Sequence, residues 1–278
     1  MQPQVPAKAF YLPFETGRRF CLYHEAVGPS ACRGSVLYIH PFAEELNRSR
    51  RMAALQARAF AAGGWSVLQA DLFGCGDSDG DFADADWARW TSDVAEASRW
   101  LQARSGTSPI FWGMRAGCLL ASNAARALDA APDFVFWQPV ISGKQFLRQF
   151  LRIKFAAQLI AGDARERVRT DDLHAELRRG RSVEVAGYTV SGALAQGLDD
   201  ALLDPPARPG KIAWLEVSDG EDPALTPAGR NWIERRRVDG TAIHSRCIRG
   251  PMFWQVQQYE ESPALIAATL EAARAFAT

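Results

Sequence analysis

Short apolar runs alternate with amphipathic stretches along most of the chain, and this alternation constrains the fold more than any other feature. The runs are rich in Val, Ile, Phe and Trp and have the length of a strand; they span residues 36–39, 65–69, 109–112, 134–137, 212–217 and 242–248. Continuous apolar runs of this length are typical of strands buried on both faces of a parallel sheet. Strands that alternate with helices imply right-handed crossovers. We therefore predict an α/β fold with a mostly parallel sheet of roughly eight strands and helices on both faces.

The stretches between the runs predict the helices. Helical spacing of apolar residues indicates helices over about 47–62, over about 85–104, and from a turn near 115 to about 128. Residues 10–26 contain strand-like pieces without an intervening helix, so we expect an antiparallel edge there. Residues 143–209 break the alternation, with a helix over 144–160, a short strand pair at 183–190 and a helix from 191 to about 203. We predict one domain, 1–278, with a helical lid inserted at 143–209.

Charge and cysteine content exclude several classes of protein. The chain has 32 basic residues (Lys and Arg) and 32 acidic residues (Asp and Glu), so its net charge is zero. No overall electric field therefore attracts nucleic acid or an anionic membrane. The amino terminus, MQPQVPAKAF, lacks the apolar run of a secretory signal, and no later segment approaches the roughly 20 apolar residues that span a bilayer. The five cysteines are scattered without a C-x-x-C pair. We expect a cytoplasmic protein with reduced thiols.

The stretch FWGMRAGCLLA, residues 111–121, has the pattern of the tight strand-to-helix turn on which many hydrolases mount a nucleophilic serine. Small residues stand where that turn needs them, at Gly113, Ala116 and Gly117, but the central position is Arg115. A guanidinium stays protonated at any working pH and offers no usable lone pair. The ordinary nucleophile is therefore missing.

Three segments match the α/β-hydrolase fold in the correct order, each directly after a predicted strand: residues 40–42 (HPF), 71–78 (DLFGCGDS) and the turn at 113–117 (GMRAG). The chain resembles that fold over nearly its whole length. Within the fold, the phrases HPFAEELNRSRR, DLFGCGDSDGDF, WGMRAGCLLA and GPMFWQVQQYEESPALI resemble the exosortase A system-associated hydrolase 2 family, which is encoded with bacterial exopolysaccharide and protein-sorting genes. The resemblance implies a hydrolase or acyl-transfer enzyme acting on an ester or thioester in exopolysaccharide or envelope biogenesis. That family also tends to lack the elbow serine.

The other members of a Ser-His-Asp triad are also in doubt. The histidine is expected after the last strand, but residues 249–255 contain none, and His244 lies within the predicted strand itself. The acid is expected after the strand at 212–217, where Asp219, Glu221 and Asp222 are found. Without nucleophile and histidine, the proton shuttle of the triad cannot be assembled.

Other residues offer alternative chemistry. His40 precedes the loop that borders the elbow and is a candidate base for activating water, with Glu44 or Glu45 to orient its ring; the alternative is a histidine that only hydrogen-bonds its loop. Cys118 is either a nucleophile or a small side chain packed against the sheet. A metal site at His40, Glu44 and Glu45 needs one more convergent ligand that the sequence does not supply, and the acidic run from 77 to 81 lacks the glycine and glutamate of a calcium loop. We expect no metal and no cofactor.

Arg115 adds a full positive charge where a helix begins, and helix N-termini favour anions. In one interpretation it binds the acidic group of a small anionic or acyl ligand beneath the lid. The residues predicted to line that site are Phe42, Glu44, Met114, Arg115, Gln138, Phe253, Trp254 and Gln255. In the other interpretation Arg115 is neutralised internally, and the candidate partners are Glu44, Glu45, Asp219 and Asp222.

The predicted helix over 144–160 is basic and amphipathic. Lys144, Arg148 and Arg152 recur every four residues beside a large apolar surface. Such helices bind membranes or acidic partners such as a carrier protein. A lid that packs its apolar side on the body explains the same pattern.

Two functions from different classes follow. If the protein is an enzyme, we expect His40 as base, Arg115 with loop N–H groups as anion stabiliser, and Asp219 or Asp222 as orienting acid. The alternative is a non-catalytic protein that binds an anionic or acyl ligand through Arg115, or a scaffold for a partner protein.

Overall fold

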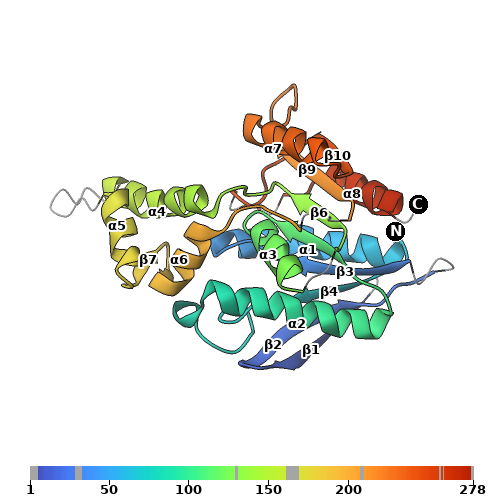
Figure 1. Ribbon diagram of the computed structural model, residues 1–278, viewed down its shortest axis with the longest axis horizontal. Helices are drawn as coiled ribbons and strands as arrows, with labels where there is room; N and C mark the ends of the chain where they lie inside the picture. Colours follow the sequence, from blue (N-terminus) through green and yellow to red (C-terminus); the bar gives the residue numbers. More distant parts are fainter. Residues whose placement is uncertain are drawn as a thin grey trace.

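An eight-stranded sheet forms the centre of the molecule (Figure 1). The computed structural model describes residues 6–28, 33–128, 131–160, 169–206, 210–256, 258 and 260–276, with only the backbone for 157–160. The strands lie in the order β1-β2-β4-β3-β5-β6-β9-β10. Their bounds are β1 Ala7–Phe14, β2 Gly17–His24, β3 Gly34–Ile39, β4 Trp65–Ala70, β5 Ile110–Met114, β6 Phe134–Trp137, β9 Ile212–Ser218 and β10 Ile243–Arg249. The β1–β2 hairpin is an antiparallel edge, and the strands from β4 to β10 are parallel. The predicted mostly parallel sheet with an antiparallel edge is confirmed.

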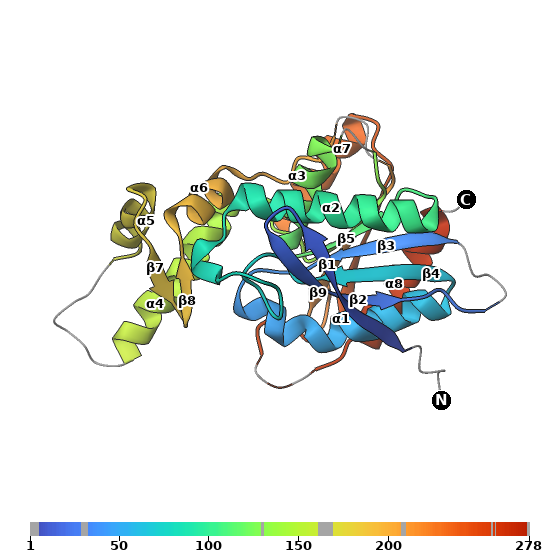
Figure 2. The same cartoon turned by 90° about the horizontal axis from the view of Figure 1, so that it is seen from below.

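Helices cover both faces of this sheet, as Figure 2 shows for α1 and α2. Helices α1 (Glu44–Ala62) and α8 (Pro263–Phe276) pack on one face, and α2 (Trp87–Ser105) and α3 (Gly117–Ala127) pack on the other. Helix α7 (Pro227–Val238) joins the second group, because its Trp232 stacks on Trp214 of β9 with 4.8 Å between ring centroids. Each face thus has its own apolar core.

Local capping sets the ends of the helices. Asp86 precedes α2 and accepts a hydrogen bond from the Arg89 amide at 2.7 Å, and Gly106 ends the helix at a positive φ of 74°. Helix α1 begins at Glu44, three residues before the predicted start. The chain reverses at Ala43, which has a φ of 50°, so the two glutamates that follow enter the first helical turn, where carboxylates are favoured.

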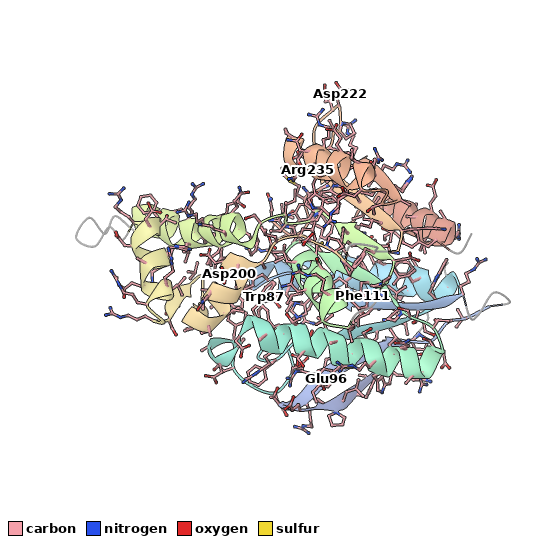
Figure 3. The ribbon with its side chains drawn as sticks, in the orientation of Figure 1. Trp87, Glu96, Phe111, Asp200, Asp222 and Arg235 are labelled. Atoms are coloured by element: carbon pink, nitrogen blue, oxygen red, sulfur yellow. The ribbon has the colours of Figure 1, made fainter. Side chains whose placement is uncertain are left out.

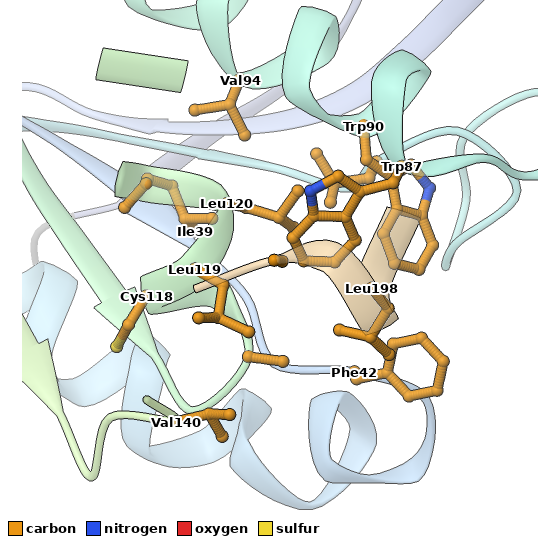
Figure 4. Close-up of a cluster of buried hydrophobic side chains, with 14 of the residues drawn as sticks. Ile39, Phe42, Trp87, Trp90, Val94, Cys118, Leu119, Leu120, Val140 and Leu198 are labelled. Atoms are coloured by element: carbon orange, nitrogen blue, oxygen red, sulfur yellow. The ribbon is translucent and has the colours of Figure 1, made fainter. Parts of the chain in front are cut away.

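A segment inserted between β6 and β9 stands to one side of the sheet (Figures 1 and 2). It contains α4 (Gly143–Ile160), α5 (Thr170–Arg178), the hairpin β7 (Val183–Val185) and β8 (Tyr188–Val190), and α6 (Gly192–Asp200). Figure 4 shows Leu198 of α6 beside Phe42, in one apolar cluster with Trp87 and Trp90 of the body. Part of the predicted lid range, residues 161–168 and 207–209, lies outside the described residues. Its role as a lid stays a prediction.

A buried ion pair ties the edge of the sheet to α2. The Arg19 side chain is fully buried and donates from Nε and Nη2 to the two carboxylate oxygens of Asp93, each at 2.8 Å. Asp93 also accepts the amide of Phe73 at 2.8 Å. One carboxylate therefore joins β2, α2 and the loop after β4.

We expect Asp93→Asn to lower the free energy of unfolding by about 3–5 kcal/mol, because it leaves the buried Arg19 cation without a counter-charge. Urea unfolding followed by circular dichroism measures the change. Asp79→Asn is the matched control, since it removes the exposed pair between Arg18 and Asp79 and should have little effect. Equal effects of the two variants would contradict the importance of the buried pair.

Candidate functional site

The turn between β5 and α3 holds Arg115 in a left-handed backbone conformation, with a φ of 54°. The Arg115 amide donates to the carbonyl of Trp137 at 2.9 Å, and the Arg115 carbonyl accepts from the amides of Cys118 and Val140. Gly117 approaches the end of β3 so closely that a side chain there would collide with the carbonyls of Ile39 and His40. Such strain in a non-glycine residue persists only where the surroundings enforce it. The predicted strand-to-helix elbow is present, with arginine at its tip.

The Arg115 side chain pairs with Glu45 at the start of α1. Its Nε donates to Oε1 of Glu45 at 3.0 Å, and the two side chains are 17% and 21% exposed. The guanidinium carbon lies 5.7 Å from the ring centre of Phe146 and 5.8 Å from that of Trp254. Within the described part of the chain, Nε makes the only side-chain hydrogen bond of Arg115. The two terminal nitrogens of the guanidinium are therefore available to a ligand.

Arg115 borders a cleft of about 240 Å³ between the elbow, the start of α1 and helix α4. The lining residues are Phe42, Glu44, Glu45, Arg48, Arg115, Phe146, Gln149, Phe150, Ile153, Ala186, Trp254 and Gln255. Five of the eight predicted ligand-binding residues are among them, namely Phe42, Glu44, Arg115, Trp254 and Gln255. Most of the remaining wall comes from α4, so the inserted segment forms one side of the cleft.

Three predicted ligand-binding residues lie outside the cleft. Met114 is fully buried and accepts a hydrogen bond from the Tyr38 hydroxyl on its sulfur at 4.0 Å, on the face of the sheet covered by α1. Phe253 is buried against Trp137. The side-chain oxygen of Gln138 accepts the amide of Val217 at 2.8 Å and so joins β6 to β9. These side chains support the frame of the site and do not line it.

His40 is buried at the end of β3 with both ring nitrogens hydrogen-bonded. Because the Leu72 amide can only donate, Nε2 accepts it, at 3.2 Å, and Nδ1–H donates to the carbonyl of Pro41 at 2.8 Å. Burial lowers the pKa of the ring and keeps it neutral. His40 lines a second cavity, of about 180 Å³, under Arg50 and Asp71. The structure does not place it as a base for the Arg115 cleft, because its two ring nitrogens join the loop after β3 to the loop after β4.

The two candidate acids after β9 are exposed to solvent. Asp219 borders a surface depression near Arg249, and Asp222 lies at the tip of the loop that precedes α7 (Figure 3). Neither lines the cleft, so neither is positioned to pair with Arg115 or to orient a base there.

Cys118 is fully buried, and its thiol points to the carbonyl of Trp137 at 3.9 Å. Burial raises the pKa of this thiol well above its ordinary value, so the thiolate needed for attack is suppressed. The packing interpretation of Cys118 fits the structure.

The residues that the structure describes contain no candidate metal site and no candidate membrane span. No group of three His, Cys, Asp or Glu side chains there is close enough to hold a metal ion. No helix in the same ranges is long and apolar enough to cross a membrane.

The cleft also contains residues that sequence reasoning did not assign to a ligand. Arg48 donates to the carbonyl of Gln255 at 2.7 Å and lies 3.7 Å from Glu44, to which it is related by helical spacing. Glu44 in turn accepts the hydroxyl of Tyr188 in β8 at 3.1 Å, which joins α1 to the inserted segment. An earlier predicted start of α1 would have revealed the Glu44–Arg48 spacing.

Charge in the cleft is balanced between two arginines and two glutamates. Burial raises the pKa of the Glu45 carboxyl above its ordinary value, and the Arg115 cation opposes that rise. Glu45 therefore takes up a proton at a higher pH than an exposed glutamate does. Once Glu45 is protonated, the charge of Arg115 is no longer compensated by its hydrogen-bond partner.

Several solved structures share the fold. A soluble variant of a monoglyceride lipase from Saccharomyces cerevisiae aligns with a TM-score of 0.64 and 15% identity over 99% of this chain and 96% of that chain. Est1E from Butyrivibrio proteoclasticus, solved with ferulic acid, aligns with a TM-score of 0.62 and 14% identity. The alignment covers 96% of this chain and 97% of that chain. A serine hydrolase without a lid from Xanthomonas campestris aligns with a TM-score of 0.58 and 14% identity. The alignment covers 99% of this chain and 97% of that chain.

No protein-family model and no curated protein matches the sequence. Likeness at such low identity establishes architecture alone. The strand order, the elbow at Arg115 and these alignments agree that the chain has the α/β-hydrolase fold.

Proposed function

We propose that the cleft binds a small amphiphilic anion non-covalently, with Arg115 holding the anionic group. The observation that carries this proposal is the partial pairing of Arg115, which uses Nε for Glu45 and keeps its terminal nitrogens free of the described residues. Arg115 also stands two residues before the start of α3, where backbone N–H groups and the helix dipole favour negative charge. A carboxylate or sulfate fits the planar fork of such a cation.

The walls of the cleft support a ligand with an apolar part. Four buried aromatic rings line the cleft, namely those of Phe42, Phe146, Phe150 and Trp254. Ile153 also lines it and is 48% exposed. The volume of about 240 Å³ lies below the roughly 300–1,000 Å³ typical of drug-sized ligand pockets, so a short acyl or alkyl chain is the expected size.

A second candidate function is hydrolysis or acyl transfer on an ester or thioester, in exopolysaccharide or envelope biogenesis as the sequence resemblance implies. The specific observation in its favour is Glu45, a carboxylate with a raised pKa in the same cleft as a cation that can stabilise an oxyanion. Trp254 lies beside Arg115 in the loop after β10, where a triad histidine would be needed. Any catalysis here would use water and Glu45 instead of a covalent intermediate on the elbow.

We expect Arg115→Gln to weaken the binding of hexyl sulfate by about 10- to 100-fold, because hydrogen bonds to a charged group contribute roughly 1.5–3 kcal/mol. Isothermal titration calorimetry with the purified protein measures this change. Arg126→Gln is the matched control, since Arg126 is an arginine of α3 that pairs with Asp204 and is not among the cleft residues. Equal affinity of wild type and Arg115→Gln, or equal affinity for hexanol and hexyl sulfate, would contradict the proposal.

The affinity for hexyl sulfate should fall as the pH rises, although the charge of this ligand is constant. At low pH Glu45 is protonated and Arg115 is free to pair with the sulfate, whereas at high pH the Glu45 carboxylate competes for it. Calorimetry between pH 5 and 8 should show a change of roughly tenfold, equivalent to about 1.4 kcal/mol. Glu45→Gln should remove the pH dependence and keep the tight binding. A Glu45→Gln variant with the wild-type pH profile would show that another group is responsible.

Hydrolysis of p-nitrophenyl butyrate separates the two candidate functions. The binding proposal predicts no turnover above buffer. The hydrolytic alternative predicts turnover that resists fluorophosphonates and is lost in Glu45→Gln. The control variant Glu96→Gln changes a glutamate of α2 outside the cleft and should keep the wild-type turnover. A covalent adduct on any side chain of the cleft would contradict both.

A further inference from the structure

Helix α4 has an unusual charge for a chain that is neutral overall. Its 18 residues include four cationic side chains and no acidic one. Lys144, Arg148 and Arg152 follow one another at four-residue spacing and are all exposed. We name these three residues the basic stripe.

The positive charge of the basic stripe is mostly uncompensated. Arg148 lies 3.7 Å from the exposed Asp171 of α5, a distance at the outer limit of an ion pair. Lys144 and Arg152 form no ion pair with any residue in the described ranges. Such charge attracts an acidic surface and attenuates with salt.

The apolar side of α4 is already used within the protein. Its buried apolar side chains are Phe146, Leu147, Phe150 and Leu151. The two phenylalanine rings make edge contacts with the ring of Phe42. A helix that lies in a membrane interface needs a free apolar face to insert. Among the side chains that the structure describes on α4, up to residue 156, Ile153 is the exposed large apolar one. The described outer side of the helix therefore favours a polar, charged contact with a protein.

The basic stripe also lies beside the entrance of the cleft. Gln149 and Ile153 line the cleft, and Arg152 stands between them in the helix sequence. Figure 1 shows α4 extending from the body with α5 and α6 on one side of it. A partner on the outer side of α4 would therefore sit next to the ligand site.

We propose that the basic stripe is a docking surface for an acidic helix of a partner protein, with carboxylates at four-residue spacing. Three cations separated by four residues span about 12 Å along a helix, at 1.5 Å per residue. A facing helix with the same spacing of glutamates matches each cation with one carboxylate. An acidic carrier protein is a partner with this chemistry. The docking does not depend on which ligand the cleft binds.

A charge-swap experiment tests the docking surface. The probe is a synthetic 20-residue helical peptide, of roughly the length of one globular helix, with glutamates at four-residue spacing, measured by fluorescence anisotropy at low salt. The stripe variant K144E/R148E/R152E should bind this peptide at least tenfold more weakly than wild type does. It should instead bind a peptide with lysines at the same positions, which also shows that the variant is folded.

The control variant R58E/R99E/R230E changes the net charge equally at three exposed arginines of α1, α2 and α7, none of which forms an ion pair among the described residues. It should bind the glutamate peptide like wild type. Equal weakening in stripe and control variants would overturn the proposal in favour of non-specific attraction. Tighter binding to phosphatidylglycerol vesicles than to the peptide, lost in the stripe variant, would overturn it in favour of a membrane surface. Hexyl sulfate binding, measured on the same variants, reports separately on the cleft.

Discussion

The ion pair between Arg115 and Glu45 decides what the elbow of this protein can do. The backbone at the elbow is held at a positive φ by hydrogen bonds to β6 and to the segment after it, so the side chain at its tip is presented to the cleft whatever its identity. In a serine hydrolase that position carries a nucleophile. Here it carries a permanent cation with a carboxylate beside it, and the proposed function follows from that change: recognition of charge in place of covalent attack.

The frame around this pair is rigid for reasons unrelated to ligand binding. Gly117 allows α3 to approach the end of β3, and His40 joins its own loop, through Nδ1 and Pro41, to the loop after β4, through Nε2 and Leu72. Arg19 and Asp93 fasten the antiparallel edge to α2. Because these contacts would serve a serine equally well, the fold can be retained while the residue at the elbow changes. The shared fold therefore does not by itself assign hydrolysis to this chain.

The sheet was predictable because its strands are short, apolar and regularly separated, a pattern that few folds produce. Helix α7 was not predicted, since five of the twelve residues of Pro227–Val238 are charged and its buried side chains are only Trp232 and Ile233, with Thr226 as the cap. The site was predictable in part, because parallel strands deliver their following loops to one edge and so bring Arg115 and Trp254 together. The direction of individual side chains was not: Gln138 has a φ of 43° and turns toward β9, and Met114 points to the opposite face of the sheet. Those directions depend on local backbone geometry that residue spacing does not encode.

The partial pairing of Arg115 has a consequence for selectivity. A half-buried guanidinium without a partner would be costly, so Glu45 stabilises the empty cleft. The same carboxylate competes with any anion for Arg115, which means that charge alone provides only part of the affinity. The remainder must come from burying apolar surface against Phe42, Phe146 and Trp254, at about 25 cal/mol per Å². Simple inorganic anions lack that contribution. The proposed binding therefore requires the cleft to distinguish an anion that carries a chain from one that does not.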